Sequence, residues 1–171
     1  MKDAIRQKLL TQRLALSVKE VERFSQSLIE KIQQLSIYKS AKHVGIYSPI
    51  KNEPNLFPLM QDHKQFYLPK VVGDTLIYLP WNGKDTLVKS ALGILEPTGV
   101  NKKNPILDLL IIPGIGFDRK GNRIGFGKGF FDSFLNEHRP KVVIGVAFPF
   151  QMLASIQVTD FDQMVDQVIV A

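Results

Sequence analysis

Between a mostly apolar run at residues 106–112 and a helical pattern that starts at Phe130 lies the segment Pro113-Gly114-Ile115-Gly116-Phe117-Asp118-Arg119-Lys120-Gly121-Asn122-Arg123-Ile124-Gly125-Phe126-Gly127-Lys128-Gly129-Phe130-Phe131-Asp132. Six glycines are interspersed there with four cationic side chains. Glycine lets backbone amides approach a ligand closely, and guanidinium and ammonium groups supply the charge that a polyphosphate needs. The helix N-terminus just beyond adds unpaired amides and a partial positive charge. We therefore interpret the segment as an exposed phosphate-binding loop, suited to a nucleotide.

Two common phosphate-binding loops do not match this segment. A Walker A loop needs four residues between its first glycine and Gly-Lys-Ser/Thr, whereas five residues separate Gly121 from Gly127-Lys128, and Gly129 replaces the hydroxyl residue. The spacing of Gly125, Gly127 and Gly129 also departs from the Gly-x-Gly-x-x-Gly of dinucleotide-binding folds. A passive surface loop is the remaining alternative, which the density of glycines and cations disfavours.

Helical and strand-like patterns alternate along the chain, which predicts an α/β fold. A first helix is expected at 3–16, with Arg13 outside its apolar face. A second is expected to start at the capping box of Ser17 and Glu20 and to run to Leu35, and a third to start at Phe130. A helical turn is expected at 55–60 and a loop at 96–99. Strands are expected at 43–47, 66–68, 76–79, 109–112, 142–147 and 168–171, the second and third of them ended by prolines. Together these elements predict a single domain over 1–171, with a mostly parallel sheet flanked by helices and the glycine-rich phosphate-binding loop before a helix.

Composition excludes several functions. The chain has no cysteine, so disulfides and thiolate metal sites are unavailable. Its first residues lack an apolar signal region, and no run approaches the roughly 20 apolar residues of a membrane span. We therefore expect a cytoplasmic monomer without a membrane partner. The formal net charge of +6 suits small anions as well as nucleic acid, but without an arginine-rich run or an aromatic RNA-binding motif no nucleic-acid partner is expected.

The segment 113–132, with the helix start Phe131-Asp132-Ser133-Phe134-Leu135, resembles the signature loop of the 5-formyltetrahydrofolate cyclo-ligase family. Shorter pieces elsewhere are similar to the family in the right order: Lys2-x-x-x-Arg6, Arg13 with Leu16-Ser17, Leu68-Pro69-Lys70, residues 93–97 and residues 162–166. The chain departs from the family at Phe130-Phe131, where two tyrosines are usual, and at Pro54-Asn55. The resemblance implies an enzyme that uses ATP to cyclise 5-formyltetrahydrofolate to 5,10-methenyltetrahydrofolate, releasing ADP and phosphate.

The resemblance also implies the site residues. Arg123 and Lys128 would be catalytic, because positioning and charge stabilisation supply most of phosphoryl-transfer catalysis. The ATP contacts it implies are Lys2, Asp3, Ala4, Ile5, Arg6, Asn122, Arg123, Ile124, Gly125, Phe126, Gly127, Lys128, Gly129 and Phe130. The folate contacts it implies are Ser48, Glu53, Gly125, Phe126, Gly127, Lys128 and Gly129, with the Glu53 carboxylate pairing with N–H donors of the pterin.

The cofactor implied by the resemblance is Mg²⁺, and the partners are ATP and a reduced folate. Asp132 and Asp162 would hold the ion, with Asp166 as the alternative second carboxylate. Magnesium is commonly held by one or two carboxylates together with phosphate oxygens and water. Two other functions stay open: an ATP-binding enzyme that acts on a different formyl or amide substrate, and a basic nucleic-acid-binding module.

Overall fold

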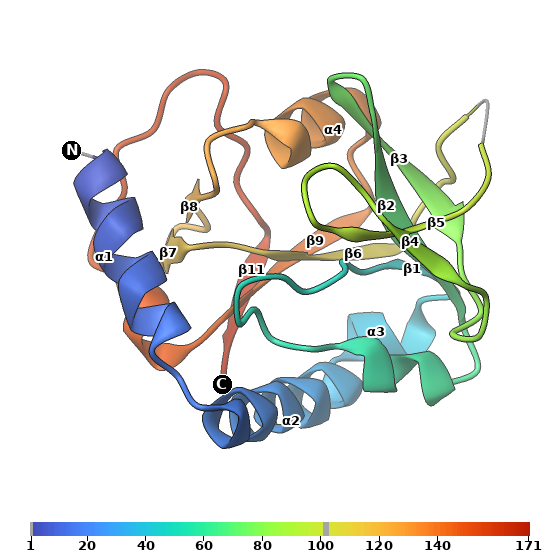
Figure 1. Cartoon of the computed structure of the whole chain (residues 1–171), viewed down its shortest axis with the longest axis horizontal. Helices are drawn as coiled ribbons and strands as arrows, with labels where there is room; N and C mark the ends of the chain where they lie inside the picture. Colours follow the sequence, from blue (N-terminus) through green and yellow to red (C-terminus); the bar gives the residue numbers. More distant parts are fainter. Residues whose placement is uncertain (1, 101–102) are drawn as a thin grey trace.

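The computed structural model describes residues 2–100 and 103–171 (Figure 1). Its helices are α1 (Lys2–Leu14), α2 (Val18–Gln34), α3 (Ser36–Ser40) and α4 (Phe130–His138), with 3₁₀ turns η1 (Phe57–Gln61) and η2 (Pro149–Gln151). The predicted capping box starts α2: Glu20 N–H donates to Ser17 Oγ at 3.3 Å, and Ser17 N–H donates to the Glu20 carboxylate at 2.8 Å. Among the described residues no helix has both the length and the apolar character needed to cross a bilayer.

The central sheet has six strands in the order β11-β9-β6-β1-β2-β3. All neighbouring pairs are parallel except β2–β3, which is antiparallel. The strands are β1 (His43–Gly45), β2 (Gln65–Val72), β3 (Thr75–Pro80), β6 (Leu109–Pro113), β9 (Val142–Ala147) and β11 (Gln167–Val170). Smaller sheets are built from β10-β7-β8 and from β4-β5, with β4 (Leu87–Lys89), β5 (Leu95–Pro97), β7 (Gly116–Asp118), β8 (Arg123–Ile124) and β10 (Met152–Leu153). The predicted α/β class with a mostly parallel sheet is confirmed.

Helices cover both faces of the sheet (Figure 1). Alternate residues of β6 show the two layers: Leu109 and Ile111 pack with α2 and α3, whereas Leu110 and Ile112 pack with α4. Strands buried on both faces become continuous apolar runs, which is why the run at 109–112 was recognisable as a parallel strand. Helix α1 lies to one side, where Leu9 packs with Ile115, Ile124 and Ile156 beside the small β10-β7-β8 sheet.

The structure corrects several sequence expectations. Pro69 does not end a strand but lies inside β2, opposite Tyr78. Tyr78 N–H donates away from β2, to Asn104 Oδ1 at 2.8 Å, so the Pro69 nitrogen faces the β1 side, and β1 has already ended at Gly45. Proline is tolerated there because no ladder hydrogen bond is lost. The predicted loop at 96–99 is also partly wrong, since Glu96 and Pro97 belong to β5.

The glycine-rich segment and Arg13 are less exposed than expected. The first part of the segment is not an open loop, because it contains β7 and β8 of a small sheet, and Arg123 is 8% exposed. The prediction that Arg123 is a surface residue is therefore wrong. Arg13, expected off the apolar face of its helix, is only 1% exposed. Arg13 is buried by Lys51, Gly114 and Glu53, which come from distant segments that a helical period cannot reveal. Arg123 is instead packed against its own segment, beside Gly114, Phe131 and Asp132.

Candidate functional site

A cavity of about 900 Å³ opens at the carboxyl ends of β1 and β6. After β1 the chain turns to the α2 face, where η1 packs, and after β6 it turns to the opposite face, where α4 packs. Adjacent parallel strands whose connections diverge in this way leave a crevice between them, and ligands of α/β proteins bind there. Residues 47–53 form one wall of the cavity and residues 113–114 and 123–133 form another.

One end of the cavity is basic. Its lining includes Lys2 and Arg6 from α1 together with Arg123 and Lys128 from the glycine-rich segment. Arg6 Nε donates to Gly125 O at 2.8 Å, which ties α1 to this segment. Lys128 is exposed. Four cations converging from two distant segments make this end suited to a polyanion.

The backbone at this end also leaves room for a ligand. A Cβ built at Gly125 would lie 2.6 Å from Arg123 Nη1, so the absence of a side chain there makes space for the guanidinium. Gly129 starts α4 with φ +70 and no side-chain cap, and a Cβ at Gly129 would have no neighbour within 4 Å. The first-turn amides of α4 therefore begin at an open cavity wall, which is the usual arrangement of a helix N-terminal anion site.

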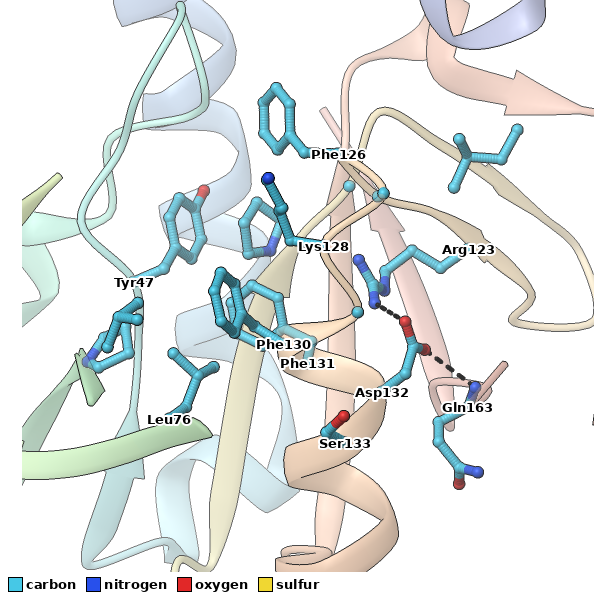
Figure 2. A pocket seen from close by; sticks show the side chains of 18 of the residues that line it. Tyr47, Leu76, Arg123, Phe126, Lys128, Phe130, Phe131, Asp132, Ser133 and Gln163 are labelled. Carbon is cyan, nitrogen blue, oxygen red and sulfur yellow. Dashed lines mark hydrogen bonds and ion pairs between the residues drawn. The ribbon is translucent and has the colours of Figure 1, made fainter. Parts of the chain in front are cut away.

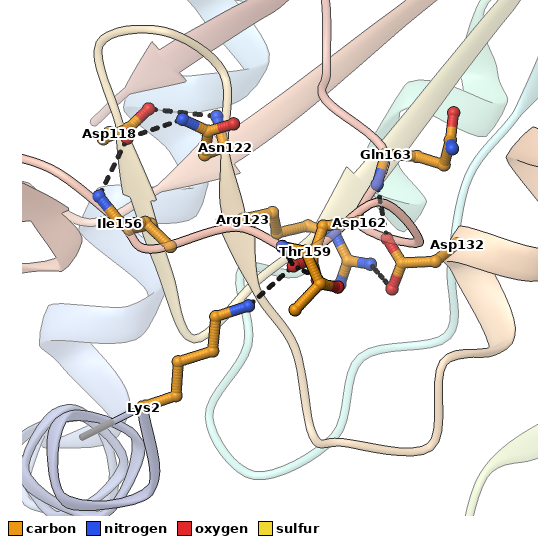
Figure 3. A network of polar contacts seen from close by, with 9 residues as sticks. All are labelled: Lys2, Asp118, Asn122, Arg123, Asp132, Ile156, Thr159, Asp162 and Gln163. Carbon is orange, nitrogen blue, oxygen red and sulfur yellow. Dashed lines mark hydrogen bonds and ion pairs between the residues drawn. The ribbon is translucent and has the colours of Figure 1, made fainter.

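Two ion pairs border the basic end (Figure 3). Arg123 Nη2 donates to Asp132 Oδ2 at 3.1 Å, and Gln163 N–H donates to Asp132 Oδ1 at 3.0 Å. Lys2 Nζ lies 2.7 Å from Asp162 Oδ2, which also accepts a hydrogen bond from Thr159 N–H at 2.6 Å. Partial burial raises the pKa of Asp162, but the hydrogen bonds from Lys2 and Thr159 outweigh it and hold that pKa below its usual value. The Lys2–Asp162 ion pair and the Gln163–Asp132 hydrogen bond join the segment 159–163 to the rest of the site.

The two aspartates fit a magnesium ion that is held mainly by phosphate. Within residues 2–100 and 103–171 no group of three or more His, Cys, Asp or Glu side chains could hold a metal ion. Both Asp132 and Asp162 line the cavity. Each Asp132 oxygen accepts one hydrogen bond, and the hydrogen bonds found for Asp162 all end on Oδ2. Lone pairs therefore remain for an ion that keeps phosphate and water ligands.

The other end of the cavity is mostly apolar. Figure 2 shows Phe130 and Phe131 together with Leu76 and Tyr47 around this part of the cavity. The lining also includes Pro69, Val71, Leu92 and Ile94. Aromatic and aliphatic walls with a few polar groups are typical of sites for flat ring systems.

Two polar residues of the loop after β1 reach this region. Ser48 Oγ donates to Leu95 O at 2.5 Å, so its hydroxyl holds the β4-β5 hairpin. Glu53 is 4% exposed and lines the cavity. Its Oε2 accepts a hydrogen bond from Ile50 N–H at 3.0 Å. Burial raises the pKa of Glu53 to about 7, against the opposing effect of the Arg13 charge and the Ile50 hydrogen bond. A buried carboxylate in a mostly apolar part of the cavity can select a ring that presents N–H donors.

The structure brings most of the predicted site residues together, but not all. Those that line the cavity are Lys2, Arg6, Ser48, Glu53, Arg123, Ile124, Gly125, Phe126, Gly127, Lys128, Gly129, Phe130, Asp132 and Asp162. Asp3 and Ala4 are exposed beside the cavity, and Ile5 packs against the cluster around Leu9. Asn122 Nδ2 donates to Asp118 Oδ2 at 2.9 Å behind the cavity wall. Asp166 accepts from Arg139 and from Val143 N–H instead of lining the cavity, which favours Asp162 as the second carboxylate.

Several lining residues were not anticipated from the sequence. Asp160, Phe161 and Gln163 come from the connection before β11, and Phe161 is 86% exposed although it borders the cavity. Glu96 on β5 lines the cavity and accepts from Val71 N–H at 3.1 Å. Asp160 and Phe161 precede the family-like piece 162–166, and no period or motif marked them; Gln163 lies within that piece but had no predicted role. Glu96 and Pro97 belong to the piece 93–97 that resembles the family, but the resemblance did not predict a binding role for them.

Fold and site together define an α/β protein with one cavity that joins a basic, glycine-rich end to an apolar end. The family is established by comparison: the chain belongs to the 5-formyltetrahydrofolate cyclo-ligase family, whose model matches residues 1–171. The solved structure of 5,10-methenyltetrahydrofolate synthetase from Aquifex aeolicus is similar with a TM-score of 0.88 and 34% identity, covering 99% of this chain and 89% of that one.

Curated relatives agree with this assignment. The 5-formyltetrahydrofolate cyclo-ligase of Mycoplasma pneumoniae is 32% identical over 158 residues, which cover 88% of this chain and 87% of the relative. The mouse protein of the same name is 29% identical over 181 residues, covering 94% and 89%. The resemblance seen in the sequence is therefore confirmed, and the chain belongs to a family of enzymes.

Proposed function

We propose that this chain catalyses the ATP-dependent cyclisation of 5-formyltetrahydrofolate to 5,10-methenyltetrahydrofolate, with release of ADP and phosphate. The observation that carries the proposal is the two-ended cavity, in a chain of this family. Its basic end suits a nucleotide triphosphate, and its apolar end with a buried carboxylate suits a pterin. The reaction needs both molecules side by side, because the formyl oxygen must reach the terminal phosphorus.

In the proposed first step, the oxygen of the N5-formyl group attacks the γ-phosphorus of ATP, and ADP leaves. An amide-type oxygen is a poor leaving group until it is phosphorylated. Arg123 and Lys128 would stabilise the charge that develops on the transferred group, and Arg123 suits this role because its planar fork can pair two oxygens. The open backbone at Gly129 and the start of α4 would hold the remaining phosphates.

In the proposed second step, N10 attacks the activated carbon, loses its proton, and phosphate leaves as the five-membered ring closes. No side-chain nucleophile is required, since proximity and orientation supply much of the rate. Glu53 would hold the pterin by accepting its N–H donors, which requires the ionised carboxylate. A magnesium ion at Asp132 and Asp162 would neutralise phosphate charge during transfer.

The direct test is an absorbance assay for methenyltetrahydrofolate with purified protein, 5-formyltetrahydrofolate, ATP and magnesium. Product is expected only when ATP is present. Formation at the same rate without ATP, or no product with a folded protein, contradicts the proposal. ATP hydrolysis that responds to a different formyl or amide compound would instead favour a related enzyme with another substrate. We also propose that the enzyme acts as a cytoplasmic monomer without nucleic acid.

A further inference from the structure

Arg13 is a buried arginine that lies behind the cavity rather than in its lining. Its side chain is 1% exposed although it belongs to the last turn of α1. A buried guanidinium is costly unless its donors are paired. Nε donates to Lys51 O at 2.9 Å and Nη1 donates to Gly114 O at 3.1 Å. Within the part of the chain that the structure describes, buried Nη2 has no hydrogen-bond partner.

The two carbonyls that Arg13 binds belong to opposite walls of the cavity. Lys51 lies in the connection after β1, and Gly114 follows β6, so the guanidinium joins the two sides of the crevice from behind. The Arg13 guanidinium carbon also lies 5.5 Å from the centre of the Phe126 ring, in the glycine-rich segment. Arg13 therefore contacts both walls of the cavity and a residue beside its phosphate-binding end.

The third group that faces Arg13 is the Glu53 carboxylate. Arg13 Nη2 lies 3.8 Å from Glu53 Oε1, too far for a direct hydrogen bond but close enough for strong electrostatic attraction in a buried site. The other groups whose charge acts on Glu53 are Lys51 and Arg123, and Arg13 has the largest effect of the three. The nearby Tyr47 hydroxyl donates to Pro54 O at 2.6 Å. Removing the Arg13 charge would therefore raise the pKa of Glu53 further.

We infer that Arg13 is a positioning residue for folate binding: it holds the loop that carries Glu53 against the opposite wall and favours the ionised form of the Glu53 carboxylate in its buried place. This inference deepens the proposed function, on which its folate step rests. Arg13 itself does not touch the substrate. Its effect on Glu53 exists in the protein without any ligand, so it can be measured independently of catalysis.

The experiment is a ¹³C NMR titration of the glutamate carboxyls in the ligand-free protein, with Glu53→Gln used to assign the Glu53 signal. In Arg13→Gln the Glu53 midpoint is expected to rise by about one pH unit or more, since an adjacent cation typically lowers a carboxyl pKa by one to three units. The dissociation constant of Arg13→Gln for 5-formyltetrahydrofolate at pH 7 is expected to rise about tenfold. Its difference from the wild type should shrink as pH rises past the new midpoint.

Asn52→Ala is the matched control for a merely structural effect. Asn52 Nδ2 donates to Arg13 O and Leu16 O, each at 3.2 Å, so this change loosens the same loop while Arg13 keeps its charge. The Glu53 midpoint is expected to stay at its wild-type value in this variant. Arg13→Lys, which keeps the charge but not the fork, should give a midpoint below that of Arg13→Gln.

Two results with folded Arg13→Gln would overturn the inference. The first is a wild-type Glu53 midpoint in folded Arg13→Gln. The second is a raised midpoint with unchanged folate affinity, because Glu53 would then not serve the folate. If Arg13→Gln does not fold, the Arg13 guanidinium ¹⁵N signals of the wild type should still shift with the Glu53 titration, and their failure to do so would equally overturn it. Absence of methenyltetrahydrofolate formation would count against the proposed function alone, since it leaves the titration unaffected.

Discussion

Replacing Arg123 with methionine removes the guanidinium but keeps a long side chain at a position that is 8% exposed. Methionine is preferable to alanine here. The guanidinium carbon lies 5.5 Å from the centre of the Phe131 ring, and Arg123 Cγ would lie 3.1 Å from a Cβ built at Gly114. A small residue would therefore leave a void in the cavity wall and confuse a catalytic loss with a folding loss.

The structure indicates that Arg123 contributes little to stability. Its hydrogen bond to Asp132 joins side chains that are 5% and 23% exposed, and Asp132 keeps the Gln163 N–H donor when Arg123 is removed. In the described part of the chain the buried Arg123 Nε has no hydrogen-bond partner, so removing it also removes an unfavourable group. Because Asp132 is only partly buried and stays hydrogen-bonded, we expect the free energy of unfolding to change by about 1 kcal/mol, the net contribution of a typical hydrogen bond.

The catalytic loss is expected to be much larger than the loss of stability. Removing a preorganised donor to developing negative charge typically costs about 2–4 kcal/mol of barrier. At about 1.36 kcal/mol per tenfold in rate, this corresponds to a fall in kcat of about 30- to 1,000-fold. The measurement is the initial rate of methenyltetrahydrofolate formation at saturating ATP and folate, with thermal unfolding of the same sample.

Arg119→Met is the matched control, because Arg119 is an exposed arginine of the same segment and does not line the cavity. Its kcat is expected to stay within about twofold of the wild type, as for most surface changes away from special features. A folded Arg123→Met protein with kcat within about threefold of the wild type would refute the reasoning. Phosphate charge would then be stabilised by other cations of the cavity.

Three further predictions concern the metal, the phosphate-binding end and the buried carboxylate. Asp132→Asn should shift the magnesium dependence of activity to higher concentration, because the amide keeps the shape but loses the charge; an unshifted curve contradicts a metal role. Lys128→Met should raise the Michaelis constant for ATP. Because Lys128 is exposed, its stability should change by no more than about 0.5 kcal/mol. An unchanged Michaelis constant for ATP would contradict a role of Lys128 in ATP binding. Burial raises the pKa of Glu53 from 4.5 to about 7, so its contribution to stability is complete below pH 4.5 and is lost as pH rises through 7, by about 3 kcal/mol. Urea unfolding at a series of pH values across this range should show that this loss of stability is absent in Glu53→Gln. If the free energy of unfolding changes equally with pH in both proteins, the prediction is wrong.

Local sequence patterns predicted many of the helices and strands. Continuous apolar runs identified β6 and β9 because strands buried on both faces leave no polar positions, and Ser17 with Glu20 identified the start of α2 because capping is a contact between neighbours in sequence. Prolines were misleading for the opposite reason. Whether Pro69 ends β2 depends on where β1 stops, and that is a property of another segment.

The site divides in the same way. Its glycine-rich segment was recognisable because its cations and glycines lie close together in the chain. The resemblance of this segment to one family then indicated the reaction. Sequence alone thus determined the family, the sheet class and the glycine-rich part of the cavity lining. Only the tertiary structure decided that β1 and β6 lie side by side with diverging connections, that Asp162 rather than Asp166 borders the cavity, and that Arg13 is buried against Glu53. Burial and electrostatic coupling depend on which distant segments meet, and no local period records those meetings.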